Sequence, residues 1–582
     1  MRTQLDYLLR ETLTRLLADR GPMNPGDLEP RLERTRDPRH GDFTSNVALR
    51  LAKSIAAPPR EFAARILAAL PPSPLIEQAE VAGPGFINFT LTAGAYQQEL
   101  ANIIEEGPSY GCSEIGRGHR ILVEFVSANP TGPLHVGHGR HAAYGASVAN
   151  ILRATGHEVH EEYYVNDAGR QMDILAISVW LRYAELLGRQ VTFPPNAYQG
   201  TYVREIAESL RNSHGEELMD DMPSLTEALK SPDGNQERQL DVIIAEVRAL
   251  LGAERFDAVL SAALDSMLAD IKEDLSDFGV HPQNWFSERD LSAGGAIARA
   301  LDRLTQRGML YSRHGAKWFR ASSYGDEKDR VVVRENGATT YFASDIAYHL
   351  EKRERGFDHL LDVLGADHHG YVARVRAGLE AMGEPGDCLE VRLVQFVTLY
   401  RGESKVQMST RSGDYVTLRE LREEVGNDAA RFFYVSRSND QHLDFDLDLA
   451  KAHSNENPVY YIQYAHARVA SMLQKMRDGG AQWHGPDSGD LDRLTEPAEH
   501  ALMVALSRYP EIVQLAALNR APQHLVHYLR DLAASFHSYY NAHRILVDEV
   551  DLRDARVTLA VATQQVVHNG LGLLGVSAPE SM

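Results

Sequence analysis

Apolar and polar residues alternate with different periods along the first part of the chain. Leucines recur at helical spacing over residues 5–17, and helical spacing returns at residues 60–70. Residues 77–91 change to a strand-like pattern around a Gly-Pro-Gly sequence that is typical of a turn. Residues 1–110 are therefore predicted to form a separate α+β domain, and the Gly- and Ser-containing residues 107–118 are predicted to form a linker.

A short strand, a tight loop and a helix are predicted next. Residues 121–126 form an apolar run, Asn-Pro-Thr-Gly-Pro at 129–133 favours a turn, and residues 135–154 show helical periodicity. A second strand-like run at 158–165 completes a β-α-β unit, which builds a parallel sheet. Ligands of such sheets bind beyond the carboxyl ends of the strands, where the free N–H groups of a helix N-terminus favour an anion. A binding site is therefore expected at the start of this helix.

The remainder of the chain alternates between these periodicities and then becomes helical. Residues 190–283 are acidic and helix-patterned, and they are predicted to be an insertion in the α/β domain. Strand-like runs at 361–370 and 391–399 resume the sheet. Beyond residue 426 the pattern is almost wholly helical, apart from a breaker-rich link at 479–490. The predicted fold is α/β with a parallel sheet, an N-terminal α+β domain and a C-terminal all-α bundle.

Composition narrows the class of protein. With 43% hydrophobic and 24% charged residues among 582, the chain is typical of a soluble protein of several domains. It has no apolar run of about 18 residues and no signal-peptide pattern at its start, so we expect a cytoplasmic protein without a membrane partner. Cys112 and Cys388 are too few for a Cys-rich zinc site and are expected to be reduced thiols.

The net charge of −21 limits how the protein can bind nucleic acid. Such a negative chain does not coat nucleic acid indiscriminately, because its background charge repels phosphates. Selective RNA binding through a few contacts on local basic surface stays compatible with it.

His135 and His138 open the predicted helix and are candidate ligand-binding residues. Because they are three residues apart on a helix, their side chains share one face. Gly137 between them lacks a side chain, so a flat ring can approach the backbone there. His141 continues the spacing, which leaves a metal site as a lesser alternative; a third residue at i+6 lies about 600° round the helix and leaves that face.

The residues around these histidines carry a family resemblance. His-Val-Gly-His at 135–138, preceded by Pro-Thr-Gly-Pro, resembles the HIGH motif of class I aminoacyl-tRNA synthetases, whose two histidines bind ATP. The longer string that starts at Glu124 is similar to that of arginyl-tRNA synthetases. The resemblance implies His135 and His138 as catalytic residues and ATP contacts from Asn129, Pro130, Thr131, Gly132, His135, Gly137 and His138.

A second stretch matches the amino-acid site of that family. Residues 339–348 are predicted to run from a strand into a helix, on which Tyr341 and Asp345 are neighbours. In arginyl-tRNA synthetases a tyrosine and an aspartate at this spacing, with the glutamate that matches Glu124, contact the guanidinium of arginine, whose fork of donors suits carboxylates. Without the resemblance, Asp345 could be a helix N-cap. The implied arginine site is Glu124, Ser127, Asn129, Tyr341, Asp345 and His369.

Two later stretches complete the implied ATP site. The strand at 361–370 ends in a polar tip that resembles the adenosine side of the family's pocket, with metal binding as the alternative. Residues 405–413 match the position of the mobile KMSKS loop, but Gln407 and Thr410 stand where that motif has lysines. The implied residues are Lys405 and Arg411 as catalytic cations, and Gly365, Asp367, His368, His369, Met408 and Ser409 as ATP contacts.

Aromatic and basic side chains are mixed in two of the C-terminal helical stretches. Such residues can stack on splayed RNA bases and bond to their edges. Tyrosines at helical spacing are equally explained as core residues. In the family this region binds the anticodon, which implies tRNA contacts from Tyr460, Tyr464, Arg468, Tyr540 and Arg544.

The resemblance spans nearly the whole chain and implies an arginine–tRNA ligase. It implies a tRNA-contacting domain at 1–110, a Rossmann-like catalytic domain at 119–400 with the insertion at 190–283, a KMSKS-like loop with stem-contact helices at 401–450, and an anticodon-binding bundle at 451–582. The expected partners are arginine, tRNA(Arg) and ATP with Mg²⁺, and we expect a monomer without a structural metal. A nucleotidyltransferase that shares the HxGH loop and a synthetase-derived tRNA-binding protein without catalysis stay open as alternatives.

Overall fold

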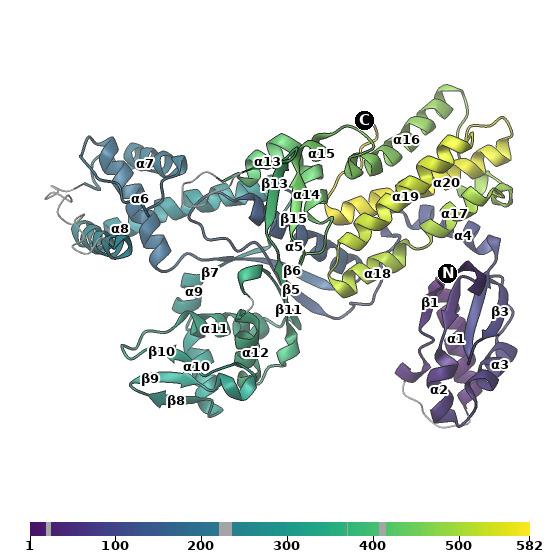
Figure 1. The fold of residues 1–582 in the computed structure, drawn as a ribbon, viewed down its shortest axis with the longest axis horizontal. Coiled ribbons are helices and arrows are strands. Elements are labelled where there is room, and N and C mark those ends of the chain that lie inside the picture. Colours follow the sequence, from purple (N-terminus) through teal and green to yellow (C-terminus); the bar gives the residue numbers. More distant parts are fainter. Residues whose placement is uncertain (19–24, 36, 220–234, 369, 407–414) are drawn as a thin grey trace.

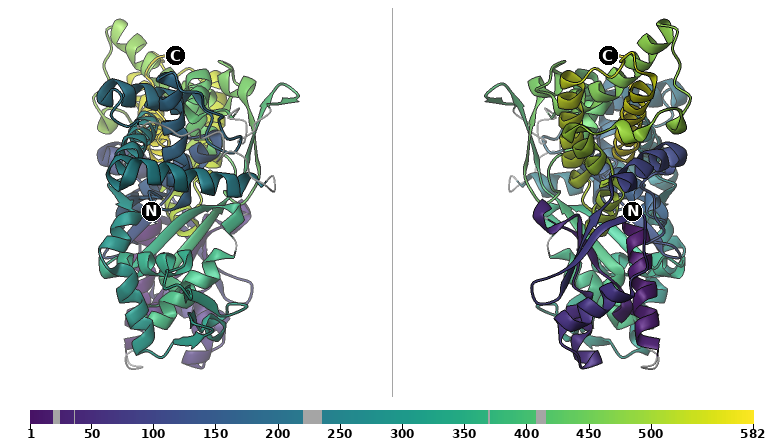
Figure 2. Two further views of the ribbon diagram at one scale, coloured as in Figure 1. Left: turned by 90° about the vertical axis from the view of Figure 1, so that its left-hand side faces the viewer. Right: turned by 90° about the vertical axis from the view of Figure 1, so that its right-hand side faces the viewer.

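The structure is a computed structural model that describes residues 1–18, 25–35, 37–219, 235–368, 370–406 and 415–582. It comprises an N-terminal domain, a central parallel sheet with a helical insertion, and a C-terminal helical bundle (Figure 1). The N-terminal domain lies below the bundle at one end of the molecule, and the insertion extends toward the other end (Figures 1 and 2).

The N-terminal domain is an antiparallel sheet covered by helices, as its α+β pattern predicted. Its strand order is β1-β2-β4-β3, with the predicted turn at residues 83–85 between the last two strands. Leu5, Leu9 and Leu13 are fully buried, which confirms the leucine face of the first helix. The elements are α1 (Arg2–Leu17), β1 (Leu32–Arg34), β2 (Phe43–Ser45), α2 (Val47–Ile55), α3 (Pro59–Ala69), β3 (Ile76–Ala82), β4 (Phe86–Leu91) and α4 (Ala93–Glu106).

The residues that follow α4 are packed between two parts of the protein. Tyr110 is buried, its hydroxyl donates to Oε1 of Glu99 at 2.8 Å, and its ring stacks on Tyr509 at 6.1 Å between centroids. The predicted linker at 107–118 connects α4 to the central sheet, and a buried aromatic ring fixes it against the C-terminal bundle.

The central sheet has five parallel strands in the order β12-β11-β5-β6-β7. The predicted β-α-β unit is confirmed: β5 (Arg120–Glu124) leads through α5 (Val136–Ala154) to β6 (Glu158–Val165). Ile121, Leu122 and Val123 of the middle strand are buried, since helices cover both faces of the sheet. The other strands are β7 (Asn284–Ser287), β11 (His359–Gly365) and β12 (Leu389–Val394), and two of the covering helices are α11 (Tyr341–Glu354) and α12 (Tyr371–Met382).

The insertion between β6 and β7 has a core of its own. It consists of α6 (Arg170–Leu186), α7 (Thr201–His214) and α8 (Gln236–Asp277), which extend to the left in Figure 1. The helix α8 is kinked at Gly252, whose φ is +69°. Trp180 of α6 is fully buried in the core that these helices share. The insertion therefore begins with α6, earlier than the predicted residue 190, because this helix packs on α7 and α8.

Two three-stranded sheets lie beside the central sheet. One of them, formed by residues 397–446, differs from the predicted elements in two places. The predicted strand at 391–399 is wrong, because the chain leaves the central sheet after Val394 and resumes in a second sheet at Val397. The helical prediction beyond residue 426 misses a strand that pairs there. One sheet contains β8 (Leu310–Arg313), β9 (Ala316–Phe319) and β10 (Arg330–Val333), near α9 (Glu288–Ala293) and α10 (Ala296–Gln306). The other contains β13 (Val397–Arg401), β14 (Ser404–Lys405) and β15 (Leu443–Asp446), near α13 (Leu418–Val425), α14 (Asn427–Tyr434) and α15 (Leu447–Lys451).

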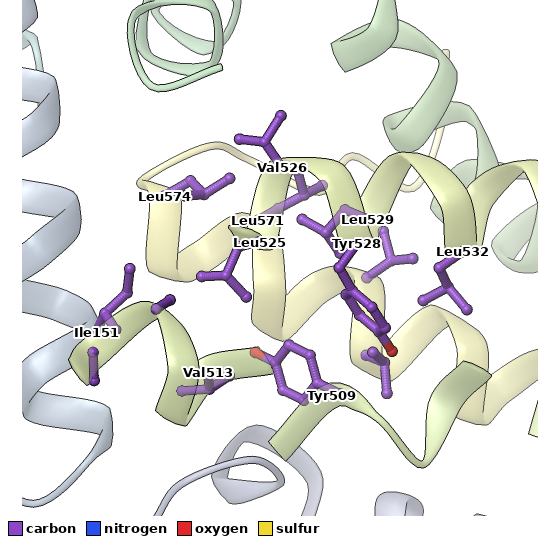
Figure 3. Packing of buried hydrophobic residues seen from close by; sticks show 14 of the residues in the cluster. Ile151, Tyr509, Val513, Leu525, Val526, Tyr528, Leu529, Leu532, Leu571 and Leu574 are labelled. Atoms are coloured by element: carbon purple, nitrogen blue, oxygen red, sulfur yellow. The ribbon is translucent and has the colours of Figure 1, made fainter. Parts of the chain in front are cut away.

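The C-terminal bundle packs directly on α5. Figure 3 shows Ile151 of α5 facing the buried side chains of three bundle helices. The hydroxyl of Tyr144 on α5 donates to the carbonyl of Arg520 at 2.7 Å, at the end of one of these helices. The bundle consists of α16 (Pro458–Asp478), α17 (Pro497–Leu506), α18 (Tyr509–Asn519), α19 (Gln523–Ala542) and α20 (Val550–Leu574).

One stretch of the bundle is unusually apolar. By length and composition alone, Pro497–Asn519 could cross a membrane. In the structure it is divided into α17 and α18, and Leu502, Leu506 and Val513 are buried within the bundle. Its apolar character is therefore explained by core packing.

Candidate active site

A cavity of about 630 Å³ opens at the carboxyl ends of the central strands. The loops after β5, β6 and β12 and the end of β11 line it, together with the start of α5 and one face of α11. This is the sheet edge at which ligands were expected. A larger cavity of about 760 Å³ lies between α1 and α4, but its carboxylate, Glu99, already accepts from Tyr110 and Asn102. The cavity at the strand ends is therefore the candidate site.

The two histidines at the start of α5 stack on each other and accept hydrogen bonds from backbone N–H groups. The rings of His135 and His138 stack with centroids 3.6 Å apart. Nδ1 of His135 accepts from the N–H groups of Gly137 (3.1 Å) and His138 (3.3 Å), and Nδ1 of His138 accepts from the N–H of His135 (3.2 Å). Burial lowers the pKa of both rings, and that of His138 falls well below its ordinary value. A neutral imidazole that accepts at Nδ1 carries its proton at Nε2, so the helix start presents two neutral N–H donors.

A metal at this helix would have to bind Nε2 of the two histidines. Nδ1 of His135 and of His138 is already occupied by backbone N–H groups. The ranges of the chain that the structure describes contain no group of three or more His, Cys, Asp or Glu side chains arranged to hold a metal ion. The stacked rings therefore fit an anion better than a cation.

The turn after β5 is strained and fixes the first carboxylate of the cavity. Val126 and Ser127 have φ values of +68° and +39°, a region that is costly for side-chain-bearing residues. Oγ of Ser127 donates to Oε1 of Glu124 at 3.0 Å and accepts from the N–H of Tyr164 at 3.0 Å. Asn166 donates to the carbonyl of Ser127 at 3.2 Å. These bonds hold Glu124 and Ser127 in one orientation at the cavity wall.

Behind Glu124 lies a buried network of charged side chains. Nζ of Lys352 is 2.6 Å from Oε2 of Glu124 and 2.9 Å from Oδ1 of Asp362. Oδ2 of Asp362 contacts Nε2 of His349 at 2.7 Å. Lys352 and Asp362 are at most 1% exposed, so the ion pair lies in a medium that screens it little. Burial by itself would lower the pKa of Lys352, but Asp362 and Glu124 outweigh it and raise that pKa.

Asp345 lies on the same face of α11 but has a different environment. Within the described part of the chain its carboxylate forms no hydrogen bond or ion pair, although it lines the cavity. Burial, followed by the charges of Glu288 and Glu124, raises its pKa to about 7. The N-cap alternative for Asp345 is wrong, because Thr340 caps α11. The strand predicted before this helix is reduced to an isolated bridge between Thr339 and Val333. When ionised, a carboxylate in the position of Asp345 can pair with a cation that binds in the cavity.

Comparison with known proteins decides the family. The model of the class I (R) tRNA synthetase catalytic domain matches residues 99–250 and 290–454. The model of the arginyl-tRNA synthetase N-terminal domain matches residues 4–91, and that of the DALR anticodon-binding domain matches 462–582. The chain belongs to the arginyl-tRNA synthetase family.

Individual relatives agree with the family models over the full length. An arginine–tRNA ligase of Thioalkalivibrio sulfidiphilus is 54% identical over 589 residues, with 100% of each chain covered. One of Coxiella burnetii is 51% identical, with 100% of this chain and 99% of the other covered. The fold is also that of Thermus thermophilus arginyl-tRNA synthetase, at a TM-score of 0.74 and 24% identity over 99% of this chain and 100% of the other. The predicted fold class is confirmed.

The structure brings together only part of the site that the synthetase resemblance implied. Tyr341 is 69% exposed at the start of α11, and it is not among the residues that line the cavity. The carbonyl of Thr131 accepts from the hydroxyl of Tyr202 at 2.6 Å, and Gly132 faces the hydroxyl of Tyr415, so this part of the loop packs on neighbouring tyrosines. The implied residues that do line the cavity are Glu124, Ser127, Asn129, His135, Gly137, His138, Asp345, Gly365, Asp367 and His368.

Several implied residues cannot be compared with the cavity. His369, Met408, Ser409 and Arg411 lie outside the described residues. Lys405 is described; it is exposed on β14, opposite Tyr400, and is not part of the cavity lining. The candidates for the catalytic cation that replaces the motif's lysines therefore remain predictions.

Sequence reasoning missed the residues that surround the two carboxylates. A signal was present on α11, where polar residues follow Asp345 at i+4 and i+7, the spacing of one helix face. Asp362 gave another signal, since it interrupts an otherwise apolar strand. The missed residues are Tyr348, His349, Lys352, Asp362 and Tyr371.

The residues implied for tRNA form a cluster on the bundle. The rings of Tyr460 and Tyr464 stack with centroids 6.4 Å apart on α16. The guanidinium of Arg468 lies 4.0 Å from the ring of Tyr540 on α19 and 5.7 Å from that of Tyr464. Tyr464 is 37% exposed, so the cluster is not fully explained as core. Arg544 is exposed beyond the end of α19 and has no described side-chain contact with the cluster.

Proposed function

We propose that the protein ligates arginine to tRNA with the use of ATP, as the arginine–tRNA ligases that it resembles do. The observation that carries this proposal is one cavity with two different walls: Asp345, without a partner among the described residues, on one, and the neutral donors of His135 and His138 on the other. Such a cavity suits a reaction in which the substrate is a cation at one end and meets a phosphate at the other.

In the first step an oxygen of the arginine carboxylate attacks the α-phosphorus of ATP, and pyrophosphate leaves. This step needs no protein nucleophile, so positioning and stabilisation of phosphate charge supply the rate. Mg²⁺ arrives with ATP as part of the substrate and neutralises phosphate charge. The residues proposed to contact ATP are His135 and His138 with Asn129, Pro130, Thr131, Gly132, Gly137, Gly365, Asp367 and His368, and the loop after Lys405.

Arginine is held through its guanidinium by two acids. Asp345 supplies an unpaired charge, and Glu124 supplies acceptor sites that Ser127 orients. Ser127 and Asn129 contact the rest of the amino acid. Tyr341, the further contact that the family resemblance implies, lies at the start of α11 outside the cavity lining. A site that hydrogen-bonds a substrate group rejects analogues that lack the group by about 10⁴–10⁵, because its polar atoms are left unpaired.

In the second step the terminal adenosine of tRNA(Arg) takes the arginyl group and releases AMP. By class resemblance the attacking group is the 2′-hydroxyl. Residues 1–110 and 451–582 bind the tRNA outside the cavity, the latter through the cluster of Tyr460, Tyr464, Arg468, Tyr540 and the nearby Arg544. We further propose that the protein acts as a cytoplasmic monomer.

The test is charging of total tRNA with labelled amino acids offered one at a time. The expected result is charging with arginine and with no other amino acid. Charging with a different amino acid, or with none, would overturn the proposal. Adenylate formation that survives removal of residues 451–582 without any tRNA product would instead point to a nucleotidyltransferase.

A further inference from the structure

Lys352 is a fully buried charge next to the cavity. It lies on α11, seven residues after Asp345 and therefore on the same helix face. Its side chain is fully buried, its Nζ contacts Glu124 and Asp362 at 2.6 and 2.9 Å, and the ring of Tyr348 lies 4.3 Å away. Two carboxylates and an aromatic face thus surround the ammonium, so that no side of it needs water.

Side chains of the protein partner both acids of the network without a substrate. Two acids, Glu124 and Asp362, face one ammonium. His349 contacts Asp362 through Nε2 at 2.7 Å and the carbonyl of Asp345 through Nδ1 at 2.8 Å. Lys352 and His349 therefore hold both oxygens of Asp362, and Lys352 also holds Glu124.

The two acids of the cavity are consequently unequal. Oε2 of Glu124 holds Lys352 and Oε1 holds Ser127, so each oxygen has about one acceptor site left. Among the residues that the structure describes, none occupies the acceptor sites of Asp345 or pairs with its charge when it is ionised. A bound cation is therefore attracted by the whole charge of an ionised Asp345. At Glu124 it can still donate hydrogen bonds, but the ammonium of Lys352 on the same carboxylate offsets the attraction.

A guanidinium and an ammonium respond differently to this arrangement. A guanidinium spreads its charge over three nitrogens and offers five donors in a plane, so it can direct its charge to Asp345 and still donate to Glu124. An ammonium concentrates its charge on one atom, and at Glu124 it would confront Lys352 across a single carboxylate. Specificity often rests on such a repulsive element as well as on attraction.

We propose that Lys352 is a specificity-determining positioning residue, which neutralises Glu124 from behind so that the cavity accepts the spread charge of a guanidinium and repels the compact charge of an ammonium. This inference rests on the proposed function, and it assigns to a residue outside the substrate's reach the rejection of lysine and similar amino acids.

The double substitution K352M/D362N tests the proposal. It removes one positive and one negative charge, so the net charge of the network is kept while Glu124 loses its ammonium. Charging of tRNA is measured with arginine, lysine and citrulline, the last being an uncharged isostere of arginine. The expected result is a rise of about tenfold or more in kcat/KM for lysine relative to arginine, mainly through KM, because like-charge repulsion is lost. The citrulline-to-arginine ratio is expected to stay unchanged.

Citrulline separates loss of repulsion from general loosening of the cavity. If lysine and citrulline gain equally, or if the lysine ratio does not change, the proposal is overturned. The control D362N keeps Lys352 on Glu124 and is expected to keep the wild-type discrimination. Wild-type protein in the same assay tests the proposed function separately, since it must charge arginine before any ratio is compared.

A second variant covers the case in which the first does not fold. K352Q/D362N keeps an amide donor for Oε2 of Glu124 without its charge, and it is expected to show the same rise for lysine. Thermal unfolding identifies the folded variants. Failure of both double variants to fold, while D362N folds, would assign Lys352 to stability alone and overturn the proposal.

Discussion

The two walls of the cavity suit ligand groups of opposite charge, and different kinds of contact hold their side chains in place. On one wall, His135 and His138 are neutral and are fixed by hydrogen bonds within a single helix start. On the other, Glu124 is fixed by Lys352, which comes from a helix 228 residues away in sequence. A neutral donor needs only local structure to be buried, whereas a buried charge needs a counter-charge from another element. The anion wall is therefore encoded locally and the cation wall by the tertiary fold.

Asp345 is the exception on its wall, and the contrast predicts where activity is most sensitive. A paired acid positions the substrate, and an unpaired acid attracts its charge. Activity is therefore expected to fall most when Asp345 loses its charge, less when the histidine wall loses one donor, and least when Tyr341, outside the cavity lining, is changed.

The largest effect is expected from D345N. Losing one partner of a buried charge pair costs about 2–5 kcal/mol, so kcat/KM for arginine is expected to fall about 30- to 5,000-fold while KM for ATP is unchanged. Steady-state tRNA charging measures both. The control E288Q makes the same chemical change at an acid that acts on Asp345 but does not line the cavity. An equal loss in E288Q would contradict the assignment.

A smaller effect is expected on the histidine wall. H138A removes one donor to a charged group, worth about 1.5–3 kcal/mol, so kcat is expected to fall about 10–10²-fold with KM for arginine unchanged. H135N keeps a good N-cap but loses the Nε2 donor, so it is expected to lose activity without losing thermal stability. If arginine binding weakens in either variant, the two walls are not independent.

The pH dependence is expected to belong to the cation wall. Burial first, then Glu288 and Glu124, raise the pKa of Asp345 from 3.8 to about 7, against His349 and Arg374. Below pH 7 Asp345 holds a proton, so kcat/KM for arginine is expected to fall about tenfold per pH unit. D345N is expected to lack this limb, and a limb that persists in D345N would assign it to another group.

The same pKa shift sets the sign of a stability effect. The folded protein holds the Asp345 proton more tightly than the unfolded chain does, so the contribution of Asp345 to stability falls as pH rises from 3.8 to about 7. D345N is therefore expected to unfold at a higher temperature than the wild type at pH 8. Saturating arginine is expected to stabilise the wild type and not the variant.

The smallest effect is expected from Y341F. Tyr341 is 69% exposed and lies outside the cavity lining, and substitutions at such positions usually change free energies by about 0.5 kcal/mol, so kcat/KM for arginine should stay within about threefold. A loss as large as that of D345N would show that the first turn of α11 moves over the bound amino acid.

The sequence predicted the elements around the cavity better than the contacts inside it. The helix predicted at 135–154 is α5, with His135 as its N-cap. An error arose where a distant partner decides: the strand predicted at 391–399 divides because β13 pairs with β15. The packing of the linker at 107–118 on Tyr509 is a distant contact of the same kind, which the sequence did not indicate. Tyr341 and Asp345 were expected together, yet only Asp345 reaches the cavity.

By itself the sequence determined the β-α-β unit, the helix start that carries His135 and His138, and the family. These depend on periodicity, caps and motifs, which act over a few residues. Only the tertiary structure decided that Glu124 is already paired and that Lys352 is the cation that pairs it. It also decided that no side chain in the described ranges pairs with Asp345. The physical reason is that the state of a buried charge depends on what the fold places within a few ångströms of it, and those groups come from anywhere in the chain.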